Sequence, residues 1–221
     1  MRSLKEIASA TDHTLLKPEA TREEIIALCN EALAFSMASV CIPPALVRVA
    51  ADYLGDRLPV CTVIGFPLGY HTTESKLQEA RQALFDGASE LDMVINIGWA
   101  KEGNFAAIEQ EIAALKKVCG SKILKVIVET CLLSDAEKIA LCRAVTDAGA
   151  DYIKTSTGFS KYGATREDVK LLADHVGEGV LVKAAGGIST LEDASDFLEL
   201  GASRLGSSRL ANLLRAAKAS E

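Results

Sequence analysis

The 221-residue sequence has few aromatic side chains, which make up 5% of it and include one tryptophan. It also lacks Cys-x-x-Cys pairs, so its six irregularly spaced cysteines predict buried thiols in a reducing cytosol, not a zinc knuckle or a disulfide framework. No cluster of Lys and Arg offsets the net charge of −6, and we therefore expect no nucleic-acid partner.

Signals for export and for membranes are absent as well. Residues 1–6 lack the apolar core of a signal peptide, and the longest uncharged stretch near the start, residues 32–47, is too short to cross a bilayer. The sequence therefore predicts a cytoplasmic protein with no membrane partner.

The sequence does contain eight short apolar segments that alternate with helical patterns. Most of these segments do not alternate apolar and polar residues, which is typical of parallel strands that helices cover on both faces. The expected strands lie at residues 13–16, 38–42, 60–64, 91–95, 123–128, 152–155, 180–184 and 203–206.

Helix start and stop signals separate these segments. The capping-box pattern, a Thr or Ser three residues before an acidic residue, predicts helix starts at Thr21, Ser134, Thr165 and Thr190. Glycine suits the position just past a helix end, and Gly-Ala pairs predict such ends at residues 87–88, 149–150 and 201–202.

Eight strand–helix units predict an α/β fold, a single-domain (β/α)8 TIM barrel that spans residues 1–221. A doubly wound sheet is the alternative, although it usually has fewer units. No G-x-G-x-x-G turn follows the first expected strand, so we expect no dinucleotide cofactor. In a barrel, the chemistry takes place at the carboxyl ends of the strands.

Four charged residues interrupt the apolar strands, where an unpaired charge is costly. They are Asp92, Lys125, Lys154 and Lys183, each on a different expected strand, and we expect them to converge inside the barrel. Because alternate residues of a strand face the same way, Asn96 is expected to lie on the side of Asp92, and Glu129 on that of Lys125.

Two lysines in a dry pocket make Schiff-base chemistry possible. An ammonium group disfavours a second one nearby, so one amine is expected to be neutral and able to attack a carbonyl. A carboxylate such as Asp92 would then carry protons to and from carbon. This combination predicts an aldolase that uses neither a metal nor a cofactor.

Small residues after the last three expected strands indicate a phosphate site. Glycine lets backbone N–H groups approach an anion, and the last two loops of a barrel commonly bind phosphate. The candidate phosphate-binding residues are Gly158, Gly186, Gly187, Gly206, Ser207 and Ser208.

At this point the sequence resembles a known family. The run DYIKTSTGF at residues 151–159 resembles the Schiff-base signature of the deoxyribose-phosphate aldolases, and the resemblance extends over nearly the whole chain. Further segments that carry it are residues 12–18, 39–44, 63–69, 90–98, 124–130 and 182–188.

The resemblance implies a class I aldolase that interconverts 2-deoxy-D-ribose 5-phosphate with acetaldehyde and D-glyceraldehyde 3-phosphate. It implies that Lys154 forms the imine, that Lys183 perturbs Lys154 and assists proton transfer, and that Asp92 relays protons. The six small residues named above match the family's phosphate site. Four further residues fall near the family's pocket with less defined roles: Asp12, Thr14, Cys41 and Lys125.

One departure concerns the phosphate site. The family often carries Arg where this chain has Ser189, so one phosphate-facing cation is expected to be absent; Lys161 could replace it but is interpreted as a solvated loop charge. Two alternatives stay open: a non-covalent phosphosugar isomerase or epimerase, and a non-catalytic phosphosugar-binding barrel. Family resemblance also implies a homodimer or higher homo-oligomer.

Overall fold

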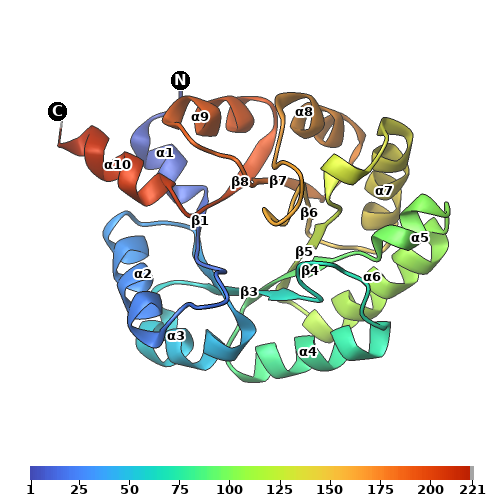
Figure 1. The fold of residues 1–221 in the computed structure, drawn as a ribbon, viewed down its shortest axis with the longest axis horizontal. Coiled ribbons are helices and arrows are strands. Elements are labelled where there is room, and N and C mark those ends of the chain that lie inside the picture. Colours follow the sequence, from blue (N-terminus) through green and yellow to red (C-terminus); the bar gives the residue numbers. More distant parts are fainter. Residues whose placement is uncertain (220–221) are drawn as a thin grey trace.

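The computed structural model describes residues 1–219 and shows eight parallel strands closed into a barrel, in the order β1 to β8 (Figure 1). Each strand pairs with its neighbours in sequence, and β8 pairs with β1. The strands are β1 (Thr11–Thr14), β2 (Ser39–Ile42), β3 (Val60–Ile64), β4 (Glu90–Val94), β5 (Ile123–Ile127), β6 (Tyr152–Lys154), β7 (Leu181–Ala185) and β8 (Ala202–Ser207). The predicted TIM barrel is therefore confirmed, and all eight expected strands are present within one or two residues of their expected positions.

Helices form a ring around this barrel (Figure 1). The α-helices of the described residues are α1 (Leu4–Ser9), α2 (Arg22–Ala34), α3 (Val47–Leu54), α4 (Thr73–Phe85), α5 (Ile97–Lys101), α6 (Phe105–Cys119), α7 (Asp135–Asp147), α8 (Arg166–His175), α9 (Leu191–Glu199) and α10 (Leu210–Lys218). Short 3-10 turns lie at Pro44–Leu46, Gly55–Arg57 and Thr130–Leu132. Among the described residues, no helix combines the length and apolarity needed to cross a membrane.

The predicted helix signals are present where the sequence placed them. Thr21, Ser134 and Thr190 each form the full reciprocal capping box, and Thr165 caps α8 through a bond from the Asp168 backbone N–H. The three glycines predicted at helix ends, at positions 87, 149 and 201, all have a positive φ, which residues other than glycine rarely adopt.

The core explains why charges interrupt apolar strands. On β4, Leu91 and Met93 pack outward against the helices as part of the main hydrophobic core, whereas Asp92 between them faces the barrel interior. On β5, Leu124 and Val126 pack outward in the same way around Lys125. The outer layer of core thus holds the fold together and leaves the interior for polar groups.

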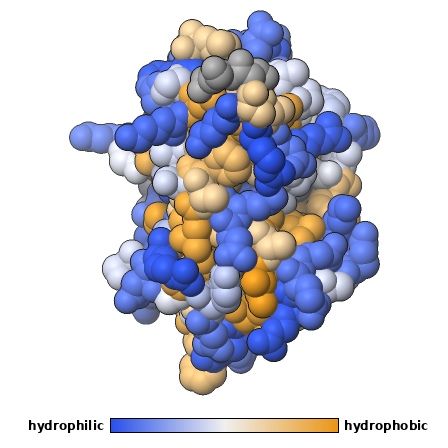
Figure 2. All heavy atoms as spheres, turned by 90° about the vertical axis from the view of Figure 1, so that its left-hand side faces the viewer, coloured by the Kyte–Doolittle hydropathy of each residue, from blue (hydrophilic) through white to orange (hydrophobic). Residues whose placement is uncertain are grey.

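The outside of the ring is mixed in character. On the side of α10, α2 and α3, Figure 2 shows hydrophilic side chains around a band of apolar ones.

Candidate active site

Strand pairing brings the predicted lysines and Asp92 together inside the barrel. Asp92 of β4 lies opposite Lys125 of β5, and Lys154 of β6 lies opposite Lys183 of β7. Each side chain is at most 4% exposed. The convergence predicted from four interrupted strands is therefore confirmed.

Asp92 is the centre of this cluster. Its Oδ2 accepts hydrogen bonds from Lys154 Nζ at 2.7 Å and from Lys183 Nζ at 2.6 Å. Its Oδ1 accepts from Lys125 Nζ at 2.9 Å and from the Cys61 thiol at 3.1 Å. Lys154 and Lys183 thus share one carboxylate oxygen, which lets a proton pass between them through a single group.

A second set of charges lies next to this centre. Lys183 Nζ also donates to Asp12, Lys125 Nζ lies 2.5 Å from Glu90, and Arg204 donates to Asp12 at 2.6 Å. The sequence reasoning missed Glu90 and Arg204, although both interrupt strands as the four predicted charges do.

The interior therefore holds one more basic side chain than it holds carboxylates. Burial raises the pKa of Asp92, but the three lysines around it outweigh burial and hold that pKa well below its usual value. Burial lowers the pKa of Lys183, but Asp12 and Asp92 outweigh burial and raise it. The same balance, with Asp92 contributing most, raises the pKa of Lys125. Lys125 and Lys183 are consequently ammonium groups, so neither is the neutral amine that the sequence led us to expect.

A cavity of about 440 Å³ opens over the carboxyl ends of the strands. Lys154 is the only one of the three clustered lysines that lines it, while Lys125, Lys183 and Asp92 lie beneath and do not contribute to its wall. The substrate cavity therefore gives access to one amine of this cluster.

The predicted phosphate residues all line the same cavity, together with Thr14. They are Gly158, Gly186, Gly187, Gly206, Ser207 and Ser208. Backbone conformation and close backbone contacts require glycine in these loops. Gly186 and Gly187 have positive φ, and a Cβ on neighbouring Gly163 would lie 2.2 Å from the Gly186 carbonyl oxygen.

Other predicted residues lie elsewhere. Asp12, Cys41 and Lys125 are completely buried in the barrel interior and do not line the cavity. The expectation that Glu129 shares a face with Lys125 is wrong, because β5 ends at Ile127 and Glu129 has a φ of +58°. Glu129 instead accepts hydrogen bonds from the backbone and the hydroxyl of Thr157.

The cavity wall also includes residues that the sequence reasoning did not select. Lys17 and Arg209 are cationic, while Phe159 and Tyr162 form an apolar part of the wall. Lys17 and Phe159 lie in segments that carry the family resemblance, whereas no motif marks Tyr162 and Arg209. All four come together only where the loops after β1, β6 and β8 meet.

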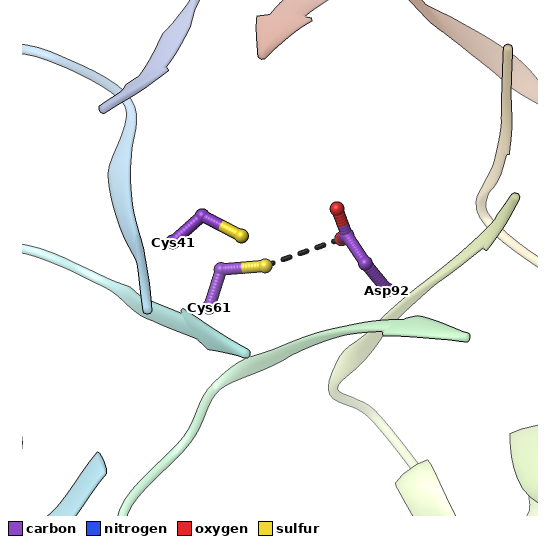
Figure 3. A group of neighbouring side chains, drawn as sticks. All are labelled: Cys41, Cys61 and Asp92. Atoms are coloured by element: carbon purple, nitrogen blue, oxygen red, sulfur yellow. Dashed lines mark hydrogen bonds between the residues drawn. The ribbon is translucent and has the colours of Figure 1, made fainter. Parts of the chain in front are cut away.

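Two thiols and a carboxylate inside the barrel form a potential set of metal ligands. Cys41, Cys61 and Asp92 have their ligand atoms within 4.8 Å of one another, and the thiols point toward the carboxylate (Figure 3). A hydrogen bond from Cys61 lowers the pKa of the Cys41 thiol, whereas burial raises that of Cys61. Both Asp92 oxygens already accept hydrogen bonds from lysine ammonium groups, so cationic side chains occupy the positions that a metal would need.

Comparisons with known proteins agree with this geometry. Residues 7–212 match the family model described as DeoC/LacD family aldolase. Relatives from Clostridium botulinum (strain Alaska E43 / Type E3) and Streptococcus agalactiae serotype Ia are both named deoxyribose-phosphate aldolase. The first is 54% identical over 95% of each chain, and the second is 53% identical over 99% of this chain and 98% of the relative.

A solved structure supports the same assignment. It is described as a unique tetrameric structure of deoxyribose phosphate aldolase from Aeropyrum pernix, with a TM-score of 0.90 and 34% identity over 99% of this chain and 94% of that chain. The chain described here belongs to the DeoC/LacD family of aldolases.

Proposed function

We propose that this protein is a class I aldolase that reversibly cleaves 2-deoxy-D-ribose 5-phosphate to acetaldehyde and D-glyceraldehyde 3-phosphate. The observation that carries the proposal is the position of Lys154. Of the three lysines gathered around Asp92, it alone lines the cavity, next to the loops suited to a phosphoryl group. An isomerase or a binding barrel would have no use for such an amine.

The covalent step begins at the substrate's aldehyde carbon, C1. Neutral Lys154 Nζ attacks C1, and the resulting carbinolamine loses water to give a protonated imine. Each of the three interior carboxylates, Asp12, Glu90 and Asp92, lies within ion-pair distance of Lys125, Lys183 or Arg204, so none of them depends on Lys154 for a counter-ion.

Cleavage then breaks the C2–C3 bond. The C3 hydroxyl gives its proton to the relay through water, and the bond electrons move to the imine nitrogen, which releases D-glyceraldehyde 3-phosphate. The remaining enamine takes a proton at C2, and water hydrolyses the imine to acetaldehyde and free Lys154. Lys183 is suited to donate protons in this relay, because it is an ammonium group that shares Asp92 Oδ2 with Lys154.

We also propose a cellular compartment and an oligomeric state for this protein. Six free cysteines suit a reducing cytoplasm. The tetrameric relative from Aeropyrum pernix supports a homo-oligomeric state for this chain, which light scattering would measure.

The test is to trap the imine. The protein is incubated with acetaldehyde, reduced with borohydride, digested and mapped by mass, and we expect a single ethylated lysine at position 154. Lys154→Met removes both the adduct and the cleavage of deoxyribose 5-phosphate, whereas Lys161→Met, in the exposed loop beyond it, changes neither. A folded protein that cleaves the sugar phosphate without any trapped lysine would overturn the covalent mechanism, and one that does neither would overturn the function.

A further inference from the structure

The cavity carries more positive charge than the family motifs explain. Its wall includes the basic residues Lys17, Lys154 and Arg209 and no carboxylate, although the chain has a net charge of −6. Lys17 lies within one of the segments that carry the family resemblance, whereas Arg209 lies outside all of them. A wall of this kind favours an anionic substrate over a neutral one.

Arg209 is the cation best placed to meet that anion. It directly follows Ser207 and Ser208 at the end of β8, and Ser207 Oγ accepts hydrogen bonds from the backbone N–H groups of Arg209 and Leu210. Within residues 1–219 the Arg209 guanidinium has no hydrogen bond or ion pair, whereas Arg215, in the helix that begins after Arg209, pairs with Glu31. The Arg209 side chain is therefore available to a ligand.

Position 189 does not supply a cation. The family often carries an arginine at this position, whereas in this chain Ser189 donates from its backbone N–H and its hydroxyl to Asp193 Oδ2, at 3.2 and 3.0 Å. Ser189 is thereby engaged with the first turn of α9, and it does not line the cavity. Lys161 does not line the cavity either.

We infer that Arg209 is the specificity-determining residue for the substrate's phosphoryl group in this chain, in place of the arginine that the family often carries at the position of Ser189. The planar guanidinium offers two parallel N–H donors to two phosphoryl oxygens, and the glycines of the neighbouring loops leave room for the group. The inference rests on the proposed aldolase function and assigns its preference for a phosphorylated sugar to one residue of the β8 loop.

The experiment compares two substrates that differ only in the phosphoryl group. Steady-state kinetics with 2-deoxy-D-ribose 5-phosphate and with 2-deoxy-D-ribose are measured for the wild type and for Arg209→Ala. We expect the KM for the phosphorylated sugar to rise about tenfold to a hundredfold, as is usual for the loss of a charged hydrogen-bonding partner. The kcat/KM for the unphosphorylated sugar stays unchanged, which also reports that the variant is folded.

Two further measurements keep the outcome decisive. Inorganic phosphate should inhibit the wild type competitively, and its inhibition constant should rise in Arg209→Ala by the same factor as KM. Lys161→Ala removes a nearby charge and should have no such effect. An unchanged KM in Arg209→Ala, an equal loss with both sugars, or the effect appearing in Lys161→Ala would overturn the inference. A wild type that cleaves neither sugar would instead refute the proposed function.

Discussion

Lys76 and Lys183 are both completely buried in this barrel, but their pKa values are shifted in opposite directions. Lys76 lies in the outer layer between α4 and α6, where its Nζ is 2.7 Å from Glu111 and donates to the Val94 carbonyl at 2.9 Å. Lys183 lies in the barrel interior, where it donates to both Asp12 and Asp92. Both lysine side chains are fully buried.

The number of carboxylates around each ammonium group explains the difference. Burial lowers the pKa of Lys76 below its ordinary value, and the single partner Glu111 does not compensate. Burial opposes the charge of Lys183 too, but Asp12 and Asp92 together raise its pKa. Burial alone therefore does not fix the pKa of a lysine, because the number of carboxylates around its ammonium group decides the direction of the shift.

The buried ion pair of Lys76 and Glu111, here called the outer pair, has a structural role instead. The Lys76 stem fills the space beside Gly65 at the end of β3, where a Cβ would lie 2.8 Å from Lys76 Cε. Its Nζ donates a hydrogen bond to the carbonyl of Val94, the last residue of β4. Lys76 does not line the cavity, so substrate has no route to it there.

The largest expected effect breaks the outer pair. Lys76→Met leaves the Glu111 carboxylate buried without its ammonium partner, which should lower the free energy of unfolding by about 3–5 kcal/mol. Urea denaturation measures this loss, and kcat per folded molecule should not change. The double variant Lys76→Met/Glu111→Leu should regain most of the stability, because it removes both buried charges. If the single variant were as stable as the wild type, the outer pair would not have the structural role given to it here.

The two sites also differ in how far the sequence predicts them. The interior lysines interrupt apolar strands, so their position was visible from the local pattern alone. Lys76 was not visible, because a lysine within an amphipathic helix usually faces solvent, and only the packing of α6 brings Glu111 against it. The same reason applies to Arg209, since loops distant in sequence form the cavity wall. Short-range patterns predicted strands, caps and interior charges; contacts between distant loops were beyond them.

A smaller effect tests the role of Lys183 inside the barrel. Lys183→Leu removes the ammonium group that shares Asp92 Oδ2 with Lys154. We expect kcat to fall about a hundredfold, in the range of a lost proton-transfer group. The pH dependence of kcat should change as well, because the variant lacks the proton donor that shares Asp92 with Lys154.

The contribution of Lys183 to the stability of the wild-type protein also depends on pH. Since the folded-state pKa of Lys183 is raised above its unfolded value of about 10.4, the stability it contributes is complete below that pH and is lost as pH rises beyond it. Lys183→Leu should lack this component of the alkaline loss in urea denaturation at increasing pH. An unchanged pH–rate profile in the variant would contradict the proposed pairing of Lys183 with Lys154.

The smallest effect concerns Glu129, a buried carboxylate that accepts hydrogen bonds from neutral groups instead of pairing with a lysine. Glu129 is 2% exposed, and among the described residues it forms no salt bridge; Thr157 provides its backbone and hydroxyl donors. Thr157 Oγ1 in turn accepts from the Phe159 N–H, so Glu129 positions the loop that carries Gly158 into the cavity wall. Glu129→Gln keeps an acceptor of the same shape but removes the charge that strengthens these bonds.

We expect Glu129→Gln to lower kcat/KM for the phosphorylated sugar by about fivefold, equivalent to about 1 kcal/mol, because charge-assisted hydrogen bonds are replaced by neutral ones. The loss should appear in KM, since the loop holds the phosphoryl end of the substrate, and trapping of Lys154 by acetaldehyde, which has no phosphoryl group, should continue at the wild-type rate. Slower trapping in Glu129→Gln would show that this carboxylate acts on the amine itself, and would move it from the positioning loop into the group of charges that control Lys154.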